Sequence, residues 1–425
     1  MIRWKTISKK LKTEGIAKSL VYYFLRFCSK AFMKTIGYFT AGRPVNPGRI
    51  VFKNRERQDF TDNARAMFEF LVNNGYNQKY EIIYMVSDRK KFRNMHYQNV
   101  KFITAESRNG WTSPLAYYYG ATARYFFYTN HSADLNRYHG KGQVTVNLWH
   151  GCGYKDAAGA SSRTAGASTM TFFDYAVVPG PVFVDTKSAY WNCEKKKLLP
   201  FGYPRYDWML DPQNKKKEIL HLLFGDSWEN CKVIIWMPTF RKSILDDYAE
   251  NNICLPYELP AVENLQQVDQ MDHWCRKNNV FLIIKNHPLQ IGWADKKKIY
   301  TNIRYISDSL LEEKQILLYR LISVCDALIS DYSSVAVDYL LLDRPLGFVL
   351  TDYEQYKNTR GFIFEDPLEY MPGAKIYNFD DLLEFIQQTA NDIDPWKNKR
   401  KELLPLMHNR CTGCCRTLAE FLEIV

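Results

Sequence analysis

This sequence lacks a long apolar segment. Its 425 residues contain no uncharged apolar run of about 18 or more, so we expect no membrane-spanning helix. The first residues also lack an apolar core followed by a small-residue cleavage site, and we expect no secretory signal. Hydrophobic residues still make up 46% of the chain, a proportion typical of a globular protein with a large core.

The ten cysteines lack the spacing of a disulfide framework. A chain of this length does not need disulfides for stability, so we expect free thiols in a reducing compartment. One cluster, formed by His408, Cys411, Cys414 and Cys415, has zinc as an alternative interpretation. A second Cys-x-x-Cys pair is missing, however, and we expect these cysteines to be free thiols at the start of the last helix.

Acidic residues are almost absent from the first 43 positions. This segment holds ten lysines and arginines but only Glu14 as an acid, so it carries +9 of the total charge of +11. The other 382 residues therefore carry only +2. A nucleic-acid-binding domain would spread basic residues over one of its faces, and no such module is recognisable, so this function is disfavoured.

Apolar residues placed among these basic residues predict one or two amphipathic helices within residues 1–40. The apolar positions are Trp4, Ile7, Leu11, Leu20, Tyr23, Phe24 and Phe27. Such a composition is typical of a helix lying in an anionic membrane surface, where each basic residue contributes about 1 kcal/mol. The alternative is a helix packed on the domain with solvated lysines. Gly42, Pro44, Pro47 and Gly48 then predict a linker.

Apolar runs alternate with helical patterns from Arg49 onwards, and this alternation predicts a mainly parallel sheet. In the first half we expect strands at 50–53, 80–86, 100–103, 125–128, 143–147, 175–178 and 197–201, and helices at 62–74 and 114–123. After a turn-rich link at Asp211 and Pro212, we expect strands at 233–236, 281–284 and 303–306, and helices at 264–278, 312–324, 380–388 and 418–424. The length suits two to three domains.

Residues 326–350 read as a strand, a polar turn, a helix and a second strand, the building block of a parallel sheet. The strands are expected at 327–330 and 346–350, and the helix at 335–342. The turn, residues 331–334, lies at the carboxyl end of a strand, where open α/β sheets bind ligands. The hydroxyls of Ser333 and Ser334 and the free N–H groups of the helix suit a phosphate. Alternatively, one serine is only an N-cap.

Three other polar stretches follow predicted strands in the same way. They are Leu148-Trp149-His150-Gly151 with Lys155, then Met237-Pro238-Thr239-Phe240-Arg241, then Lys285-Asn286-His287-Pro288. A fifth motif is Tyr356 placed four residues before Arg360 and Gly361. A histidine titrates near neutrality and can accept a proton, although a histidine that ends a strand can also be purely structural.

These five motifs, in this order, resemble the CDP-glycerol glycerophosphotransferase family, the teichoic-acid primases and polymerases. The resemblance covers roughly residues 45–425. It implies an α/β protein with two Rossmann-like domains facing a cleft, the glycosyltransferase type B fold. It also implies transfer of glycerol phosphate or ribitol phosphate from CDP-glycerol or CDP-ribitol to a hydroxyl of a membrane-linked acceptor, with release of CMP.

The resemblance suggests roles for the motif residues. We expect His150 and His287 to be catalytic, with His150 as the general base. The donor phosphates are expected at Thr239, Arg241, Asp331, Ser333, Ser334 and Arg360, and the acceptor at Trp149, Gly151 and Lys155. No Asp-x-Asp motif follows a strand, so we expect no obligatory metal ion, and no cofactor is implied.

The predicted organisation is a basic segment at 1–43, an acceptor domain at 44–208, a donor domain at 209–390 and a helical tail at 391–425. We expect a peripheral protein at the cytoplasmic face of the cell membrane, acting on an acceptor of the undecaprenyl diphosphate type. Family members often carry Thr-Pro where this chain has Cys152-Gly153, and Pro-Arg-Asn-Asp where it has Pro204-Arg205-Tyr206-Asp207, which leaves the acceptor open. Alternatives are a nucleotide-sugar transferase of the same fold and an inactive membrane scaffold, which the retained reactive residues disfavour.

Overall fold

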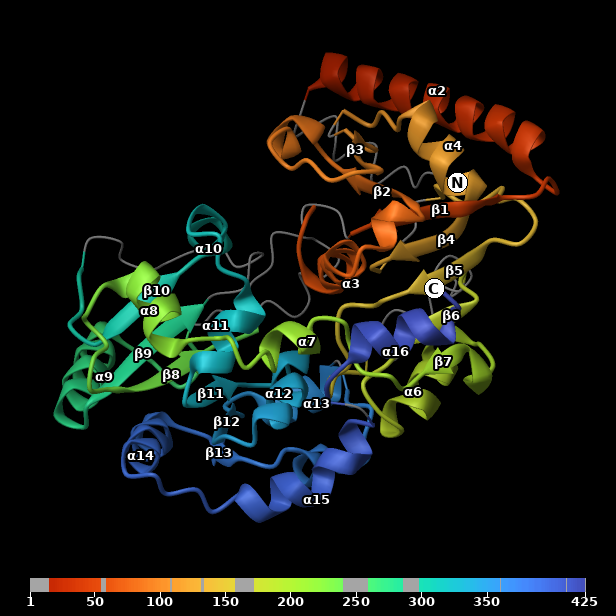
Figure 1. The fold of residues 1–425 in the computed structure, drawn as a ribbon. Helices are drawn as coiled ribbons and strands as arrows, with labels where there is room; N and C mark the ends of the chain where they lie inside the picture. Colours follow the sequence, from red (N-terminus) through yellow and green to blue (C-terminus); the bar gives the residue numbers. More distant parts are fainter. Residues whose placement is uncertain are drawn as a thin grey trace.

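The computed structural model describes residues 15–54, 59–107, 109–130, 134–156, 172–239, 259–285, 298–359, 361–409 and 411–424. Two parallel β-sheets, each flanked by helices, form its two halves (Figure 1). The predicted site residues Arg241, His287 and Arg360 lie outside the described residues, as do residues 1–14 of the basic segment.

The first sheet contains seven strands in the order β3-β2-β1-β4-β5-β6-β7. They are β1 (Asn46–Lys53), β2 (Glu81–Val86), β3 (Val100–Thr104), β4 (Ala123–Tyr128), β5 (Val144–Asn147), β6 (Tyr175–Val177) and β7 (Leu198–Leu199). The helices of this half are α2 (Ile16–Thr40), α3 (Asp62–Asn73), α4 (Pro114–Thr122), α6 (Val182–Trp191) and α7 (Tyr206–Met209). Short 3-10 turns η1 (Tyr76–Gln78), η2 (Arg89–Phe92) and η4 (Lys195–Lys197) join them.

The second sheet contains six strands in the order β10-β9-β8-β11-β12-β13. They are β8 (Lys232–Trp236), β9 (Val280–Lys285), β10 (Ile303–Ile306), β11 (Ala327–Ser330), β12 (Leu346–Val349) and β13 (Ala374–Ile376). Its helices are α8 (Lys216–Phe224), α9 (Leu265–Lys277), α10 (Asp308–Glu313), α11 (Leu318–Val324), α12 (Ser334–Tyr339), α13 (Tyr353–Thr359) and α14 (Phe379–Ala390), with η6 (Leu340–Leu342) and η7 (Pro367–Tyr370). Helices α15 (Lys397–Met407) and α16 (Cys414–Phe421) close the described chain.

Both sheets repeat one topology. In each half the first three strands run from the centre of the sheet to one edge, and the later strands run from the centre to the other edge. Every pairing between these strands is parallel, as predicted. The order reverses between β1 and β4 and between β8 and β11, and such switch points are where open α/β sheets bind ligands. The prediction of two Rossmann-like halves is confirmed.

Helices cover both faces of the second sheet. Strand β9 shows the consequence most simply, since all six of its residues are buried. Phe281 and Ile283 belong to the main hydrophobic core, whereas Leu282 and Ile284 belong to a smaller core together with Val268 of α9. An apolar run without polar alternation is what a parallel strand buried on both faces requires.

Two predicted elements are wrong. Pro47 and Gly48, expected in a linker, lie in the exposed beginning of β1, where the pairing with β4 jumps from Asn46 to Ile50. This irregularity accommodates a proline that has no N–H to donate. The helix expected at 312–324 is two helices, because Gln315 adopts a left-handed φ of 55° that ends the first of them.

The last helix returns to the first half of the molecule (Figure 1). The Asp207 carboxylate accepts hydrogen bonds from the backbone N–H groups of Cys414 and Cys415, which open α16. Tyr125 of β4 donates a hydrogen bond to the Leu422 carbonyl. His408 Nε2 contacts the Val337 carbonyl oxygen at 2.8 Å. No group of three potential metal ligands gathers within the described part of the chain.

Helix α2 lies alongside α4 on the outside of the first sheet (Figure 1). Small and polar residues of α2 also contact the segments before and after α4: Ser29 Oγ accepts a hydrogen bond from the Thr112 N–H, and Thr40 Oγ1 donates to the Tyr138 carbonyl. A methyl group at Gly37 would lie 2.5 Å from the Tyr138 ring. Over the described ranges, no helix has both the length and the apolar character needed to cross a membrane.

Candidate active site between the two sheets

The His150 loop begins where β5 ends. Asn147 Oδ1 accepts a hydrogen bond from the Trp149 N–H at 2.9 Å, and Trp149 adopts a left-handed φ of 50°. Asn63, at the start of α3, donates through Nδ2 to the carbonyls of Leu148 and Trp149 at 3.1 and 3.0 Å. The loop is therefore held by side chains from β5 and α3 in a conformation that a free chain rarely adopts.

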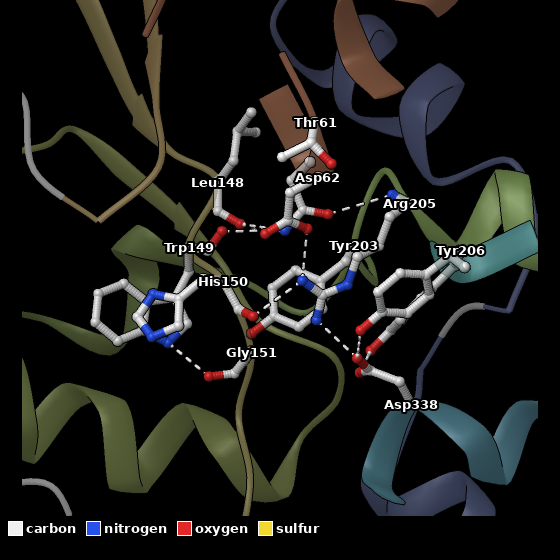
Figure 2. Close-up of polar contacts among 12 residues, drawn as sticks. Thr61, Asp62, Leu148, Trp149, His150, Gly151, Tyr203, Arg205, Tyr206 and Asp338 are labelled. Atoms are coloured by element: carbon white, nitrogen blue, oxygen red, sulfur yellow. Dashed lines mark hydrogen bonds and ion pairs between the residues drawn. The ribbon is translucent and has the colours of Figure 1, made fainter. Parts of the chain in front are cut away.

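The His150 ring lies against the Trp149 ring, with their centroids 4.1 Å apart (Figure 2). Trp149 is itself buried, and its Nε1 donates to the Gly151 carbonyl at 2.8 Å. Arg205 donates through Nη1 to the His150 carbonyl at 2.9 Å. The backbone and the ring of His150 are thus both held by neighbouring groups. The role of Trp149 in acceptor binding stays a prediction.

Two glycines bring this loop directly onto the second half of the molecule. A methyl group at Gly151 would lie 2.4 Å from Ser334 Oγ, and one at Gly153 would lie 2.9 Å from Ser334 Cα. Both distances are shorter than a Cβ atom tolerates, so only glycine permits the approach. Ser334 opens α12, and Ser333 occupies its N-cap position without a side-chain capping hydrogen bond. The structure therefore places the two glycines that follow His150 directly against Ser334, one of the predicted phosphate-binding serines.

Buried Arg205 joins the two halves behind this contact. Its Nη1 donates to Asp62 Oδ1 at 2.6 Å, and its Nη2 donates to Asp338 Oδ2 at 2.7 Å (Figure 2). Burial opposes the charge of Arg205, but the carboxylates of Asp338 and Asp62 raise its pKa well above the usual value. Asp338 follows Ser334 by four residues and so shares its face of α12.

Two tyrosines also donate hydrogen bonds to the Asp338 carboxylate. Tyr206 donates to Oδ1 and Tyr319 donates to Oδ2. Burial raises the pKa of both phenols well above the usual value, so they remain donors near neutral pH. Each carboxylate and guanidinium group of this network therefore has hydrogen-bond partners, as buried charges require.

Thr239 and Asp331 lie together at the switch point of the second sheet. Asp331 Oδ2 accepts hydrogen bonds from the Thr239 N–H at 2.9 Å and from its Oγ1 at 2.7 Å. Asp331 is fully buried, and the neighbouring Ser330 donates to the Met237 carbonyl. This contact fixes the turn that follows β8 to the turn that follows β11. Thr239 and Asp331, both predicted to bind the donor, are therefore in direct contact with each other.

Lys155 lies against the last predicted motif. Its backbone forms a bridge with Phe362, the Asp156 N–H donates to the Gly361 carbonyl, and the Ile363 N–H donates to the Tyr154 carbonyl. The Gly361 N–H in turn donates to the Tyr356 carbonyl at 3.1 Å. A segment predicted to bind acceptor and a segment predicted to bind donor thus run side by side.

Sequence reasoning missed Arg205 and Asp338 as members of the site. Arg205 entered only as part of a motif that departs from the family pattern, and Asp338 lies inside an apolar run. An acidic residue in an otherwise apolar helix was the available signal, because a buried carboxylate needs a cationic or hydrogen-bonding partner.

Comparisons with known proteins show which family and which fold this chain is similar to. The sequence model of the CDP-Glycerol:Poly(glycerophosphate) glycerophosphotransferase family matches residues 36–408. The chain is 28% identical to the teichoic acid poly(glycerol phosphate) polymerase of Bacillus spizizenii strain W23 over 366 residues, which is 82% of this chain and 85% of the relative. It is also 28% identical to the teichoic acid ribitol-phosphate primase of that strain over 247 residues, 55% of this chain and 58% of the relative.

Solved structures of the wall teichoic acid polymerase TagF have the same fold. One variant superposes with a TM-score of 0.72 at 18% identity, covering 96% of this chain and 97% of that one. A second variant, soaked with CDPG, superposes with a TM-score of 0.71 at 17% identity and 96% coverage of both chains. The predicted glycosyltransferase type B arrangement is therefore confirmed.

Proposed function

Because this chain belongs to the CDP-Glycerol:Poly(glycerophosphate) glycerophosphotransferase family, we propose that it transfers a polyol phosphate from a CDP-linked donor to a hydroxyl of a membrane-linked acceptor in teichoic acid synthesis. The donor is CDP-glycerol or CDP-ribitol, since relatives of both kinds are similar to this chain. The acceptor is a lipid-linked polymer or its first unit, of the undecaprenyl diphosphate type.

In the proposed reaction His150 accepts the proton of the acceptor hydroxyl. The oxygen then attacks the phosphorus that carries the polyol, a new P–O bond forms, and the bond to CMP breaks. Ser333 and Ser334 would donate hydrogen bonds to the diphosphate, and the leaving CMP carries away the negative charge. Thr239 would hold the turn after β8 in place through its two hydrogen bonds to Asp331. From their motifs we propose that His287 is catalytic and that Arg241 and Arg360 bind the donor phosphates.

One observation carries this proposal most directly. The close approach of Gly151 and Gly153 to Ser334 holds the loop of the candidate base, from the first sheet, against the start of α12 on the second sheet, where the phosphate site is proposed. Transfer between two bound substrates requires that kind of juxtaposition, because the reacting atoms must come within about 3–3.5 Å of each other. Arg205 supports the same geometry, since it contacts the His150 carbonyl and the helix of Ser334 together.

The test is CMP release from CDP-glycerol and from CDP-ribitol, each with and without a lipid-linked glycerol-phosphate acceptor. We expect acceptor-dependent CMP release with one of the two donors. UDP-linked sugars, run in parallel, are expected to release no UDP. Acceptor-dependent UDP release without CMP release would contradict the proposal and favour the nucleotide-sugar transferase.

We further propose that α2 holds the enzyme on an anionic membrane surface. One stripe of its apolar side chains faces away from the domain: Leu20, Phe24, Phe27 and Tyr38 are 63%, 65%, 71% and 83% exposed. Lys18, Lys30 and Lys34 are exposed on the same helix. An outward apolar stripe flanked by lysines is what a helix in the headgroup region presents to lipid. This supports a peripheral location at the cytoplasmic face of the membrane.

Substitution of Leu20, Phe24 and Phe27 by glutamine is expected to weaken binding to anionic vesicles by about a hundredfold. Each side chain would lose about 1 kcal/mol of apolar burial, less than full burial provides. The control is Leu222→Gln, which changes a leucine 57% exposed on α8 and should leave vesicle binding intact. Vesicle co-sedimentation measures both. Undiminished binding of the triple variant, with turnover on a soluble acceptor preserved, would contradict the membrane role of this face.

A further inference from the structure

Helix α6 presents a lysine to a group of aromatic rings beside the candidate base. Lys187, Tyr190 and Trp191 are spaced three and four residues apart, so they share one face of the helix. The Lys187 Nζ atom lies 4.7 Å from the Tyr190 ring centroid, 5.4 Å from that of Trp191 and 4.9 Å from that of Trp149. Trp149 comes from the His150 loop, so the rings belong to two separate elements.

The charge of Lys187 is not balanced by an adjacent acid. Its Nζ atom lies near these three rings, and no ion pair joins it to a carboxylate among the described residues. Lys195, in the same half of the molecule, pairs with Asp185 instead. The half-buried position of Lys187 lowers its pKa, and the more distant Cys152 and Asp156 only partly oppose that effect. Rings stabilise a cation but accept none of its hydrogen bonds strongly, so its donors remain available to an anion.

The distance to His150 is compatible with a phosphodiester of a polyol phosphate chain. The Trp149 ring centroid is 4.1 Å from that of His150 and 4.9 Å from Lys187 Nζ, so Nζ is at most about 9 Å from the centre of the histidine ring. In a chain of glycerol phosphates, five bonds separate the terminal hydroxyl oxygen from the nearest phosphorus. Three backbone bonds span about 3.6 Å when extended, so five such bonds span about 6 Å.

We propose that Lys187 and its three aromatic rings form the subsite for the phosphodiester next to the acceptor's terminal hydroxyl. This inference rests on the proposed function, because it takes His150 to be the group that receives that hydroxyl's proton. The ammonium donates to a phosphate oxygen, and the rings hold Lys187 in position when the site is empty. An acceptor bound here has its reactive oxygen directed toward His150 by a contact with its own backbone.

The subsite also gives a reason for the sequence of α6. A lysine that only packed against tryptophan could be replaced by methionine, which matches its length and interacts favourably with rings. A lysine that binds phosphate could not, because methionine provides no donor and no charge. Arginine, which also binds phosphate and stacks on rings, should replace it with a smaller loss.

The test compares Lys187→Met and Lys187→Arg with a matched control, Lys195→Met. Two soluble acceptors are used: glycerophosphoglycerol, which has one phosphodiester, and glycerol, which has none. For Lys187→Met we expect the KM for glycerophosphoglycerol to rise about tenfold or more, with kcat, the donor KM and the KM for glycerol unchanged. Lys187→Arg should recover most of the affinity, and Lys195→Met should behave as wild type.

Calorimetric titration of glycerophosphoglycerol into the enzyme without donor provides a reading independent of turnover. We expect Lys187→Met to weaken this binding by the same factor. Equal loss for both acceptors, a fall in kcat alone, or unchanged binding would overturn the inference. Failure of the proposed function looks different, because the wild-type enzyme would then release no CMP with either acceptor while the titration still reports whether Lys187 binds phosphodiester.

Discussion

Replacing His150 by alanine is expected to reduce acceptor-dependent CMP release by about a hundredfold or more, the usual contribution of a positioned general base. The loss should appear in kcat with little change in the donor KM, because the proposed donor contacts come from the second sheet. Steady-state CMP release at several pH values measures it.

The His150 variant needs a control for folding. His221→Ala is matched to it, since His221 is 58% exposed in its side chain and contacts Asp226 on the far side of the second half. This control should turn over as wild type, and thermal unfolding should show that both variants are folded. A folded His150→Ala variant with wild-type turnover would exclude His150 as the base.

Replacing Asp338 by alanine is expected to destabilise the protein by about 3–5 kcal/mol, because it leaves the buried Arg205 guanidinium without one of its two carboxylates. The midpoint of urea denaturation measures the change. The exposed pair of Lys195 and Asp185 is the control, since Asp185→Ala should cost no more than about 1 kcal/mol.

A double variant separates stability from positioning. Replacing Arg205 by methionine together with Asp338 by leucine removes this buried pair of charges but leaves Asp62 without its partner, so it should recover part of the lost stability. Turnover should stay low, because the His150 carbonyl still loses its hydrogen bond from Arg205. Recovery of turnover together with stability would mean that Arg205 supports folding alone and does not position His150.

The sequence was sufficient to predict that the motif turns follow strands β5, β8, β9 and β11. Four of the five motifs follow a short apolar run, and parallel strands place their carboxyl ends at one edge of a sheet. Residues Trp236 and Ser330, which end β8 and β11, bear this out, because the turns after them are joined by Thr239 and Asp331. The positions of strand ends and of the turns after them depend on local periodicity and turn composition. They can therefore be predicted without knowledge of the tertiary structure.

Contacts between distant residues could not be predicted in this way. Arg205 and Asp338 are 133 positions apart, and nothing local indicates that one will neutralise the other. The sequence also did not show which face of α2 would contact the domain. The sequence shows its apolar positions, but only the structure shows that Ser29 and Gly37 make the contact with the domain and turn the aromatic residues outward.

The return of α16 to the first half has a mechanical consequence. The chain crosses between the halves once before β8 and again before α16, so two separate tethers connect them. A body held at one point can swivel in any direction, whereas a body held at two points rotates about the line that joins them. Any opening that releases CMP would therefore follow a single hinge axis. Closure along that axis would bring Ser334 back against Gly151 and Gly153 each time. The two halves would therefore meet in the same relative position after every opening.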